Sequence, residues 1–266
     1  MEQLIKTIIF GIIQGLTEWF PISSTGHLKM AEHFMGETMP LAYDFILHIG
    51  TLIVVLLFFR KDIKNILSAL AHLDFKTEYG RLIPLIIVGT IPAVTIGIIT
   101  EGYVESTFQN LLPIATAFIL FGIILYASKV GKEETDNISY LTALTIGIAE
   151  GVAIIPGISR SGITIAVALL LGIKREKAFK FSFLLSIPAI IGAIGYTAYK
   201  ESNILAATGI SWTEITVGVI AAIVVGYFAI KILWKILNKR KFYLFAFYCW
   251  LLGVTLIFWA ILRNYP

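Results

Sequence analysis

Two short polar segments carry most of the side chains in this sequence that could do chemistry. The first contains Glu18, Ser24 and His27, and the second, 156–162, contains Arg160. A guanidinium binds phosphate oxygens through a fork of N–H donors, and an imidazole exchanges protons near neutral pH. A serine beside a base can act as a nucleophile, and a carboxylate can hold a hard divalent cation. The combination predicts phosphate-group recognition or phosphoryl transfer.

Each polar segment is predicted to be a helix break followed by a new helix. Pro21 should end the first helix at or before Phe20, because a proline disfavours helical backbone in the residue before it. Ser23 and its neighbours are favourable N-cap residues for the next helix. The second segment repeats this pattern, with a Pro-Gly break before Ser159. The free N–H groups and the dipole of each new helix start attract anions.

The rest of the chain is apolar enough to lie in a lipid bilayer. Of its 266 residues, 58% are hydrophobic and 14% are charged, whereas about 25% are charged in a typical soluble domain. This composition excludes soluble globular proteins, disordered proteins and nucleic-acid modules. We therefore attribute the net charge of +4 to basic loops at a membrane surface rather than to nucleic-acid binding. A buried arginine costs about 2.5–3.5 kcal/mol in a bilayer, which makes Arg160 a functional candidate.

Six stretches are long and apolar enough to be full membrane spans. They are approximately 42–59, 82–100, 111–128, 181–199, 213–236 and 242–262. Most Lys and Arg residues gather in four regions between them, which the positive-inside rule places in the cytoplasm: 60–81, 129–137, 174–180 and 231–241. Residues 1–40 must then begin and end outside, and 138–173 must enter and leave on the inside. Their short apolar runs and polar middles favour re-entrant hairpins. Two full crossings would also return the chain to the side from which it started, so both arrangements fit the loop charges.

A weak internal repeat connects the two polar segments. Shifting the chain by 136 residues aligns 11–26 with 147–162, and six of the 16 positions are identical. Because each copy is followed by three spans and approaches from the opposite side, we predict an inverted-topology repeat. The expected fold is an all-α integral membrane protein with six full transmembrane helices and two re-entrant helical hairpins. It would be a single domain, 1–266, of two repeats, 1–130 and 131–266, with both termini outside.

The two polar segments closely resemble those of the undecaprenyl-diphosphate phosphatase family of the bacitracin-resistance type. The matching pieces are Gln14-Gly-Leu-Thr-Glu18, 21–27 and 156–164, with lesser signatures at 89–93 and 186–189. The resemblance covers essentially the whole chain. It implies a membrane enzyme that removes the terminal phosphate of a C55 polyprenyl diphosphate and so recycles the lipid carrier of cell-envelope glycans. It also implies an active site that opens to the outer face of the cell membrane.

The resemblance also assigns roles to residues. Ser24 would be the nucleophile, His27 the proton-transfer residue and Arg160 the centre of a phosphate clamp. The family's acidic pair falls on Gln14 and Glu18, which would hold a divalent cation, Mg²⁺ or Ca²⁺; many members have Glu at the first position. The full predicted site has Ser24, His27, Glu18 and Arg160 as catalytic residues, Glu18 and Gln14 as metal ligands, and as substrate-binding residues Ser23, Thr25, Gly157, Ser159, Ser161 and Thr164.

Several alternatives remain open from the sequence. A transporter or flippase for an anionic lipid or solute could use the same anion site, and a structural membrane scaffold would not explain the buried charges. Direct attack by water, with Ser24 only positioning, is the alternative mechanism. Asp44 and His48 are interpreted as a local pair supporting a helix, in preference to a place at the rim of the site. Trp19 is expected to be an interfacial anchor, and a homodimer is allowed.

Overall fold

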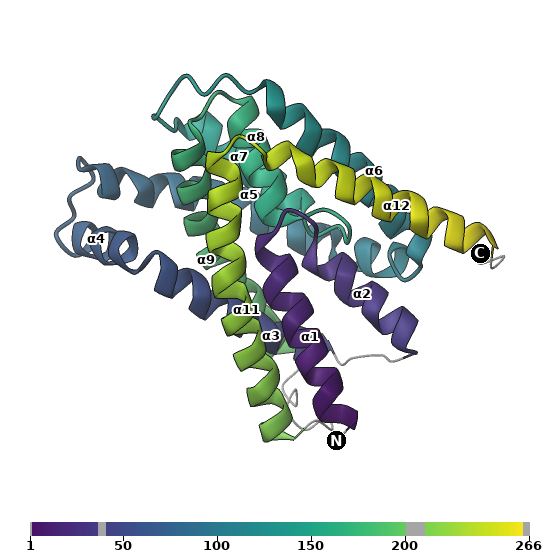
Figure 1. The fold of residues 1–266 in the computed structure, drawn as a ribbon. Helices are drawn as coiled ribbons and strands as arrows, with labels where there is room; N and C mark the ends of the chain where they lie inside the picture. Colours follow the sequence, from purple (N-terminus) through teal and green to yellow (C-terminus); the bar gives the residue numbers. More distant parts are fainter. Residues whose placement is uncertain (1, 37–40, 201–210, 263–266) are drawn as a thin grey trace.

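The protein is built from α-helices in the part of the chain that the computed structural model describes, which comprises residues 2–36, 41–200 and 211–262 (Figure 1). Two short 3₁₀ helices, η1 (Ser128–Val130) and η2 (Phe242–Leu244), accompany them. The α-helices are α1 (Glu2–Trp19), α2 (Ser24–Met35), α3 (Leu41–Phe58), α4 (Arg60–Ala71), α5 (Glu78–Thr107), α6 (Leu111–Ala127), α7 (Tyr140–Val152), α8 (Arg160–Leu170), α9 (Arg175–Lys200), α11 (Trp212–Asn238) and α12 (Phe245–Leu262).

Among the described residues, five helical stretches are long and apolar enough to cross a membrane: α5, α6 with η1, α9, α11, and η2 with α12. They correspond to five of the six predicted spans. The sixth prediction, 42–59, coincides with α3, which continues into α4 after a bend of 80°. The pair α3 and α4 qualifies only when it is counted as one bent span. The protein is thus an all-helical, multi-pass membrane protein with five or six candidate spans. The segment that joins the predicted spans 181–199 and 213–236 falls partly outside the described residues, as do both chain ends.

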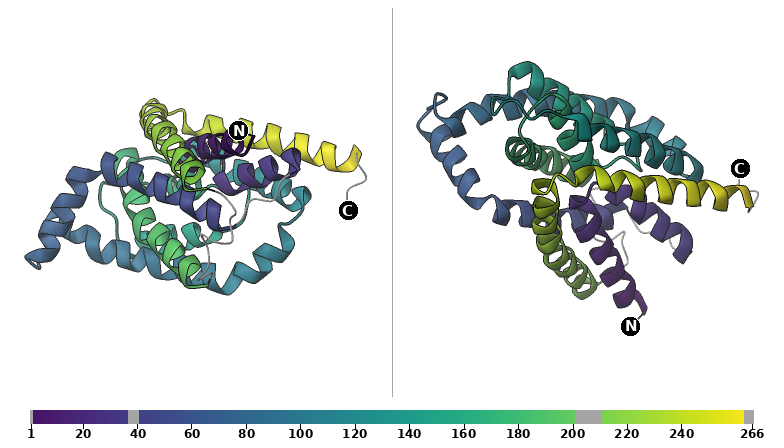
Figure 2. Two further views of the ribbon diagram at one scale, coloured as in Figure 1. Left: turned by 90° about the horizontal axis from the view of Figure 1, so that it is seen from below. Right: turned by 45° about the horizontal axis from the view of Figure 1, so that its top comes forward.

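The basic region 60–81 is expected to be a loop, but its first half forms the helix α4. Apolar residues such as Ile63 and Leu67 recur with helical spacing, while Lys61 and Lys64 remain exposed. A helix with one apolar and one basic side is typical of a membrane–water interface. Figure 2 shows that α4 extends away from the body of the protein in both further views.

The two polar segments form the predicted helix breaks. The helix α1 ends at Trp19, and α2 begins at Ser24 with Ser23 as its N-cap. In the second segment α7 is followed by α8, whose N-cap is Ser159. Each N-cap hydroxyl accepts a hydrogen bond from the backbone N–H three residues later, which satisfies one free donor of the new helix. The helices α7 and α8 have only 13 and 11 residues, too few to cross a bilayer singly.

Each helix that precedes a break packs closely against a long helix from the other half of the chain. The helix α1 lies along α11, and α7 lies along α5. Glycines allow the backbones to approach: a Cβ atom added at Gly11 would overlap the backbone of Gly218, and one at Gly147 would overlap that of Gly89. The helices α3 and α9 also pack together, as do α6 and α12, which lie side by side in Figure 1. These contacts place both breaks in the protein interior.

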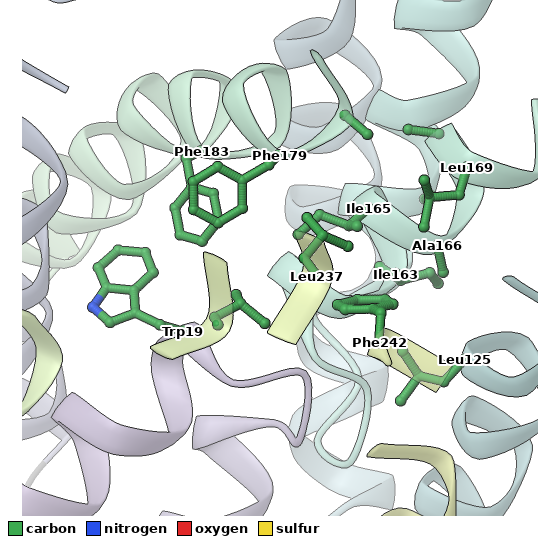
Figure 3. Packing of buried hydrophobic residues seen from close by; sticks show 14 of the residues in the cluster. Trp19, Leu125, Ile163, Ile165, Ala166, Leu169, Phe179, Phe183, Leu237 and Phe242 are labelled. Carbon is green, nitrogen blue, oxygen red and sulfur yellow. The ribbon is translucent and has the colours of Figure 1, made fainter. Parts of the chain in front are cut away.

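A cluster of aromatic side chains lies directly beside the first break (Figure 3). The ring centroid of Trp19 lies 5.2 Å from that of Phe183, and Phe179 lies 4.5 Å from Phe183. Trp19 is only 1% exposed, so its expected role as an interfacial anchor is wrong. The sequence favoured an anchor because tryptophan is common at membrane interfaces, but the position after Glu18 faces the packed core.

Candidate active site

The two helix breaks meet and hold each other through reciprocal hydrogen bonds. The Ser23 hydroxyl accepts a hydrogen bond from the backbone N–H of Gly157 at 3.0 Å. In the opposite direction, the Ser159 hydroxyl donates to the backbone oxygen of Phe20 at 3.3 Å. The Ser161 hydroxyl donates to the backbone oxygen of Trp19 at 3.1 Å. The starts of α2 and α8, which are separated by more than a hundred residues of chain, therefore lie next to each other.

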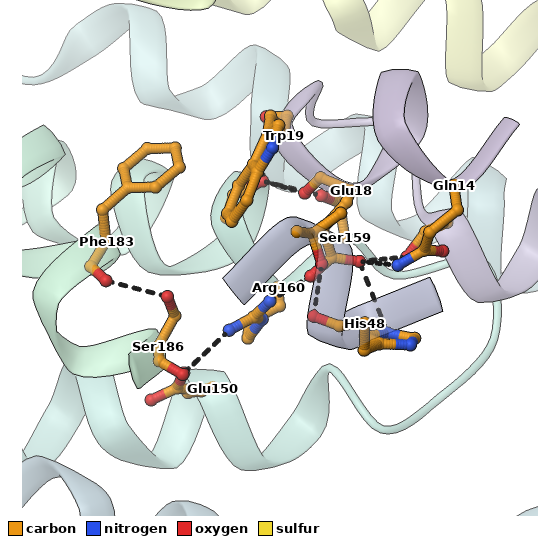
Figure 4. Close-up of polar contacts among 12 residues, drawn as sticks. Gln14, Glu18, Trp19, His48, Glu150, Ser159, Arg160, Phe183 and Ser186 are labelled. Carbon is orange, nitrogen blue, oxygen red and sulfur yellow. Dashed lines mark hydrogen bonds and ion pairs between the residues drawn. The ribbon is translucent and has the colours of Figure 1, made fainter. Parts of the chain in front are cut away.

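Glu18 is the centre of the polar cluster that forms at this meeting point (Figure 4). Its Oε2 atom accepts hydrogen bonds from the Ser24 hydroxyl at 2.7 Å and from the Gln14 amide nitrogen at 3.2 Å. Its Oε1 atom forms an ion pair with the guanidinium of Arg160. Glu18 is 6% exposed, so its buried negative charge is compensated by the partly buried Arg160 and by two neutral donors.

Arg160 connects the cluster to the second half of the chain. Its Nη1 atom donates to the backbone oxygen of Ser186 on α9 at 3.4 Å and lies 4.0 Å from a carboxylate oxygen of Glu150. Both carboxylate oxygens of Glu150 are buried and have no hydrogen-bond partner among the described residues. The guanidinium thus lies between the carboxylates of Glu18 and Glu150. Of these two carboxylates, only that of Glu18 is in close contact with it. This arrangement leaves it able to bind further oxygen atoms.

His48 belongs to this cluster, although its sequence position favours only a local pair with Asp44. Its Nδ1 atom donates to the backbone oxygen of Asp44 at 2.8 Å, in agreement with a local contact along α3. This contact is to the main chain and not to the carboxylate. The opposite nitrogen, Nε2, lies 3.6 Å from Oε2 of Glu18. An ionisable side chain in an otherwise apolar span is a functional candidate by default, and this signal could have identified His48.

His27 faces a different set of partners. Its Nδ1 atom lies 2.7 Å from the backbone oxygen of Ser23, and its Nε2 atom lies 2.7 Å from the hydroxyl of Tyr248 on α12. The imidazole also stacks on the Tyr248 ring, with centroids 5.8 Å apart. The Ser24 hydroxyl, by contrast, donates to Glu18. The predicted proton transfer between His27 and Ser24 therefore has no hydrogen bond that supports it.

The predicted substrate-binding residues have mainly structural contacts. The hydroxyls of Ser23, Ser159 and Ser161 cap helices or join the two breaks, as described above. Thr164 is buried, donates to the backbone oxygen of Arg160 at 2.8 Å, and contacts the hydroxyl of Ser182. Gly157 adopts a φ of 102°, a left-handed conformation that favours glycine. Thr25 is exposed. Direct contact between these groups and a substrate stays a prediction.

The predicted metal ligands Gln14 and Glu18 lie together. The amide nitrogen of Gln14 faces the carboxylate, and its amide oxygen is buried and has no hydrogen-bond partner in the described ranges, so this oxygen is free to bind a cation. The described residues contain no group of three or more His, Cys, Asp or Glu side chains that could hold a metal ion. Any cation bound here would need oxygens from a substrate to complete its coordination, as is common for Mg²⁺.

The protein is a multi-pass helical membrane protein in which a buried carboxylate and hydroxyl lie beside a partly buried guanidinium and imidazole where two broken helices meet. Membrane proteins with such an internal polar site form a class that suits phosphate chemistry. Comparison of the sequence with protein-family models identifies the family. The model described as bacitracin resistance protein BacA matches residues 7–255. The chain belongs to this family, which confirms the resemblance seen in the motifs.

Curated relatives agree over nearly the full length of the chain. A protein of Thermodesulfovibrio yellowstonii is 42% identical, covering 99% of this chain and 100% of its own. Proteins of Desulforapulum autotrophicum and Halothermothrix orenii are each 41% identical, covering 96% and 97% of this chain and 98% of their own. All three relatives carry the name undecaprenyl-diphosphatase.

Proposed function

We propose that this chain is an undecaprenyl-diphosphate phosphatase, an integral membrane hydrolase that converts undecaprenyl diphosphate into the monophosphate and inorganic phosphate. The observation that carries the proposal is the contact of Glu18 with both Ser24 and Arg160 where the two helix breaks meet. The proposed nucleophile Ser24, its proposed proton acceptor Glu18 and the proposed phosphate-binding cation Arg160 lie within one cluster. The shared name of the curated relatives supports the same activity.

In the proposed first step, the Ser24 oxygen attacks the terminal phosphorus of the diphosphate. Its proton passes to Glu18, which already accepts the Ser24 hydrogen bond at 2.7 Å. The bond between the terminal phosphorus and the bridging oxygen breaks, and undecaprenyl monophosphate leaves. Arg160 exchanges contacts with Glu18 for contacts with phosphate oxygens, where it compensates the charge of the transition state.

In the proposed second step, water hydrolyses the phosphoserine. The proton of the attacking water is accepted by a nearby base, the phosphorus–Ser24 bond breaks, and inorganic phosphate is released while Ser24 recovers a proton from Glu18. Both His48, through the nitrogen facing Glu18, and His27 are candidates for this base. Direct attack by water on the diphosphate would give the same products without a phosphoserine.

We propose that a divalent cation, Mg²⁺ or Ca²⁺, binds at Glu18 and Gln14 together with the substrate. The free amide oxygen of Gln14 fits a hard-oxygen ligand. When bound, such a cation would neutralise negative charge on phosphate oxygens. Removal of divalent cations with a chelator should then lower activity, and added Mg²⁺ or Ca²⁺ should restore it. Full activity in the presence of chelator would contradict a cation requirement.

We propose that the two halves of the chain, 1–130 and 131–266, form an inverted-topology repeat within one domain. In support, α1 packs on α11 and α7 packs on α5. The proposed symmetry requires both contacts, because α7 corresponds to α1 and α5 corresponds to α11. The α1–α2 and α7–α8 units would be re-entrant hairpins in the cell membrane, with both termini outside, the site open to the outer face and four basic regions inside. A homodimer stays a prediction.

Phosphate release from undecaprenyl diphosphate by the purified protein in detergent tests the proposed activity. We expect release by the wild-type protein and its loss in Ser24→Ala and Arg160→Ala. Rapid acid quenching should trap phosphate on Ser24 when the substrate is labelled in its terminal phosphate. Tight binding or lipid translocation without any phosphate release would overturn the proposed hydrolysis and favour transport.

A further inference from the structure

A separate cavity of about 840 Å³ lies where α5, α7 and α9 begin. None of its lining residues belongs to the candidate active site. Its apolar walls include the exposed Phe75, the partly exposed Leu82, and the buried Leu85 and Phe181. The backbone before α7, around Ile138, closes another side. The cavity therefore presents apolar surface at the ends of membrane-spanning helices, where lipid head groups lie.

Four basic side chains also line this cavity. Two of them have acidic partners, in the ion pairs Lys177–Glu78 and Lys180–Asp62. The other two, Lys76 and Arg81, are exposed and have no acidic side chain within ion-pair distance among the residues that the structure covers. They represent positive charge that the protein itself does not neutralise.

The remaining acidic group at the cavity does not cancel this surplus. Asp136 lines the cavity, but its carboxylate pairs with Lys174 at a distance of 2.5 Å. Counting the lining residues and their ion-pair partners together, the cations exceed the anions by two. A site that combines uncompensated cations with an apolar wall is complementary to an amphiphile that bears a negative head group.

We propose that this cavity binds the head group of an anionic glycerophospholipid, with Lys76 and Arg81 taking the phosphate and the apolar wall taking the first methylene groups of the acyl chains. A free phosphate would use the cations but would gain nothing from Phe75 and Leu82. Zwitterionic lipids carry their own cation and would gain less from the surplus charge. The proposed lipid site does not depend on the proposed hydrolysis, because none of its residues belongs to the candidate active site.

Thermal denaturation of the full-length protein in detergent tests this inference. Adding phosphatidylglycerol should raise Tm in a concentration-dependent way, because a ligand that binds only the folded state stabilises it. Phosphatidylcholine should raise Tm less. In the double variant Lys76→Gln/Arg81→Gln we expect the increase caused by phosphatidylglycerol to fall by at least half. Phosphate release measured without added lipid should be unchanged in this variant.

Two further variants separate a built site from general attraction between charges. Lys61 and Lys64 lie exposed on α4 and do not line the cavity, so Lys61→Gln/Lys64→Gln removes the same charge elsewhere. This control should keep the effect of phosphatidylglycerol. The variant Asn137→Trp keeps every cation but places a bulky ring in the cavity, and it should weaken the effect. Equal losses in the two double variants, or equal stabilisation by soluble glycerol phosphate, would overturn the proposed lipid site.

Discussion

Each of the two helix breaks ends in an N-cap serine, but the breaks present different side chains to the site. Ser23 and Ser159 occupy equivalent N-cap positions, yet the next residue is Ser24 in one break and Arg160 in the other. Two helix starts therefore lie next to each other, and one supplies the proposed nucleophile while the other supplies a cation. The residue after the N-cap serine thus makes the two sides of the site chemically different.

The breaks also differ in length, and this difference has a conformational cost. Four residues separate α1 from α2, whereas seven separate α7 from α8. In the shorter break Ser23 adopts a φ of 65°, a left-handed conformation that is unfavourable for serine. Ser159 in the longer break has a φ of −82°. The tight turn brings Ser24 back beside Glu18, so the strained residue lies next to the proposed nucleophile.

The largest effect that would test this asymmetry is expected from Arg160. We expect Arg160→Lys to lower phosphate release by about 10³-fold, because an arginine that stabilises a phosphoryl-transfer transition state contributes about 10³–10⁵-fold. Lysine keeps the charge but has no planar fork of donors. The measurement is kcat for undecaprenyl diphosphate with the purified variant, compared at equal folded fraction.

Two other variants decide whether Arg160 acts only by holding the fold. Arg175→Lys changes an arginine that makes a bidentate contact with Glu133 far from the site, and it should keep activity within a few fold. The exchange Glu18→Arg/Arg160→Glu keeps both charges but interchanges their places. If the exchanged protein were as active as the wild type, the ion pair would be structural and the proposed division of roles between the breaks would be wrong.

A smaller effect should distinguish the two carboxylates near Arg160. We expect Glu18→Gln to lower kcat by about 10²-fold, since loss of a positioned general base costs about 10²–10⁴-fold. Glu150→Gln should lower kcat by less than about tenfold, because the Glu150 carboxylate accepts no hydrogen bond from the described residues and lies 4.0 Å from the guanidinium. Steady-state kinetics of both variants provides the test, and equal losses would mean that both halves supply the base.

The two histidines should have still smaller effects, which pH dependence can separate. If His48 accepts a proton during turnover, the rate of the wild type falls at acidic pH, because a protonated imidazole cannot accept another proton. His48→Asn should then lower kcat and weaken this acidic decrease. His27→Asn should lower kcat while keeping the decrease, because His27 bonds to Ser23 and Tyr248. The reverse result would restore His27 as the base.

Local sequence signals predicted the helix breaks well and the partners of the polar side chains less well. Pro21 and the N-cap serines define the ends of α1 and the starts of α2 and α8, because these signals act within a few residues. Which nitrogen of His48 faces Glu18 depends on how α3 packs beside α1, and no local pattern encodes this. The orientation of His27 toward Tyr248 likewise depends on α12, which lies more than two hundred residues later.

The helix contacts that bring the breaks together allow a prediction on stability alone. A Cβ at Gly11 or Gly147 would overlap the backbone of α11 or α5, so Gly11→Ala and Gly147→Ala should each destabilise the protein by about 1–3 kcal/mol, as overpacking does. Gly192→Ala is the matched control on α9, because nothing lies within 4 Å of its added Cβ. Alanine at this position should be neutral or stabilise the protein by up to about 1 kcal/mol.

The Tm of each variant in detergent provides the test. Similar decreases in Tm for Gly11→Ala and Gly147→Ala would show that both halves depend equally on close backbone contact. A decrease for only one of them would mean that the two packings are not equivalent.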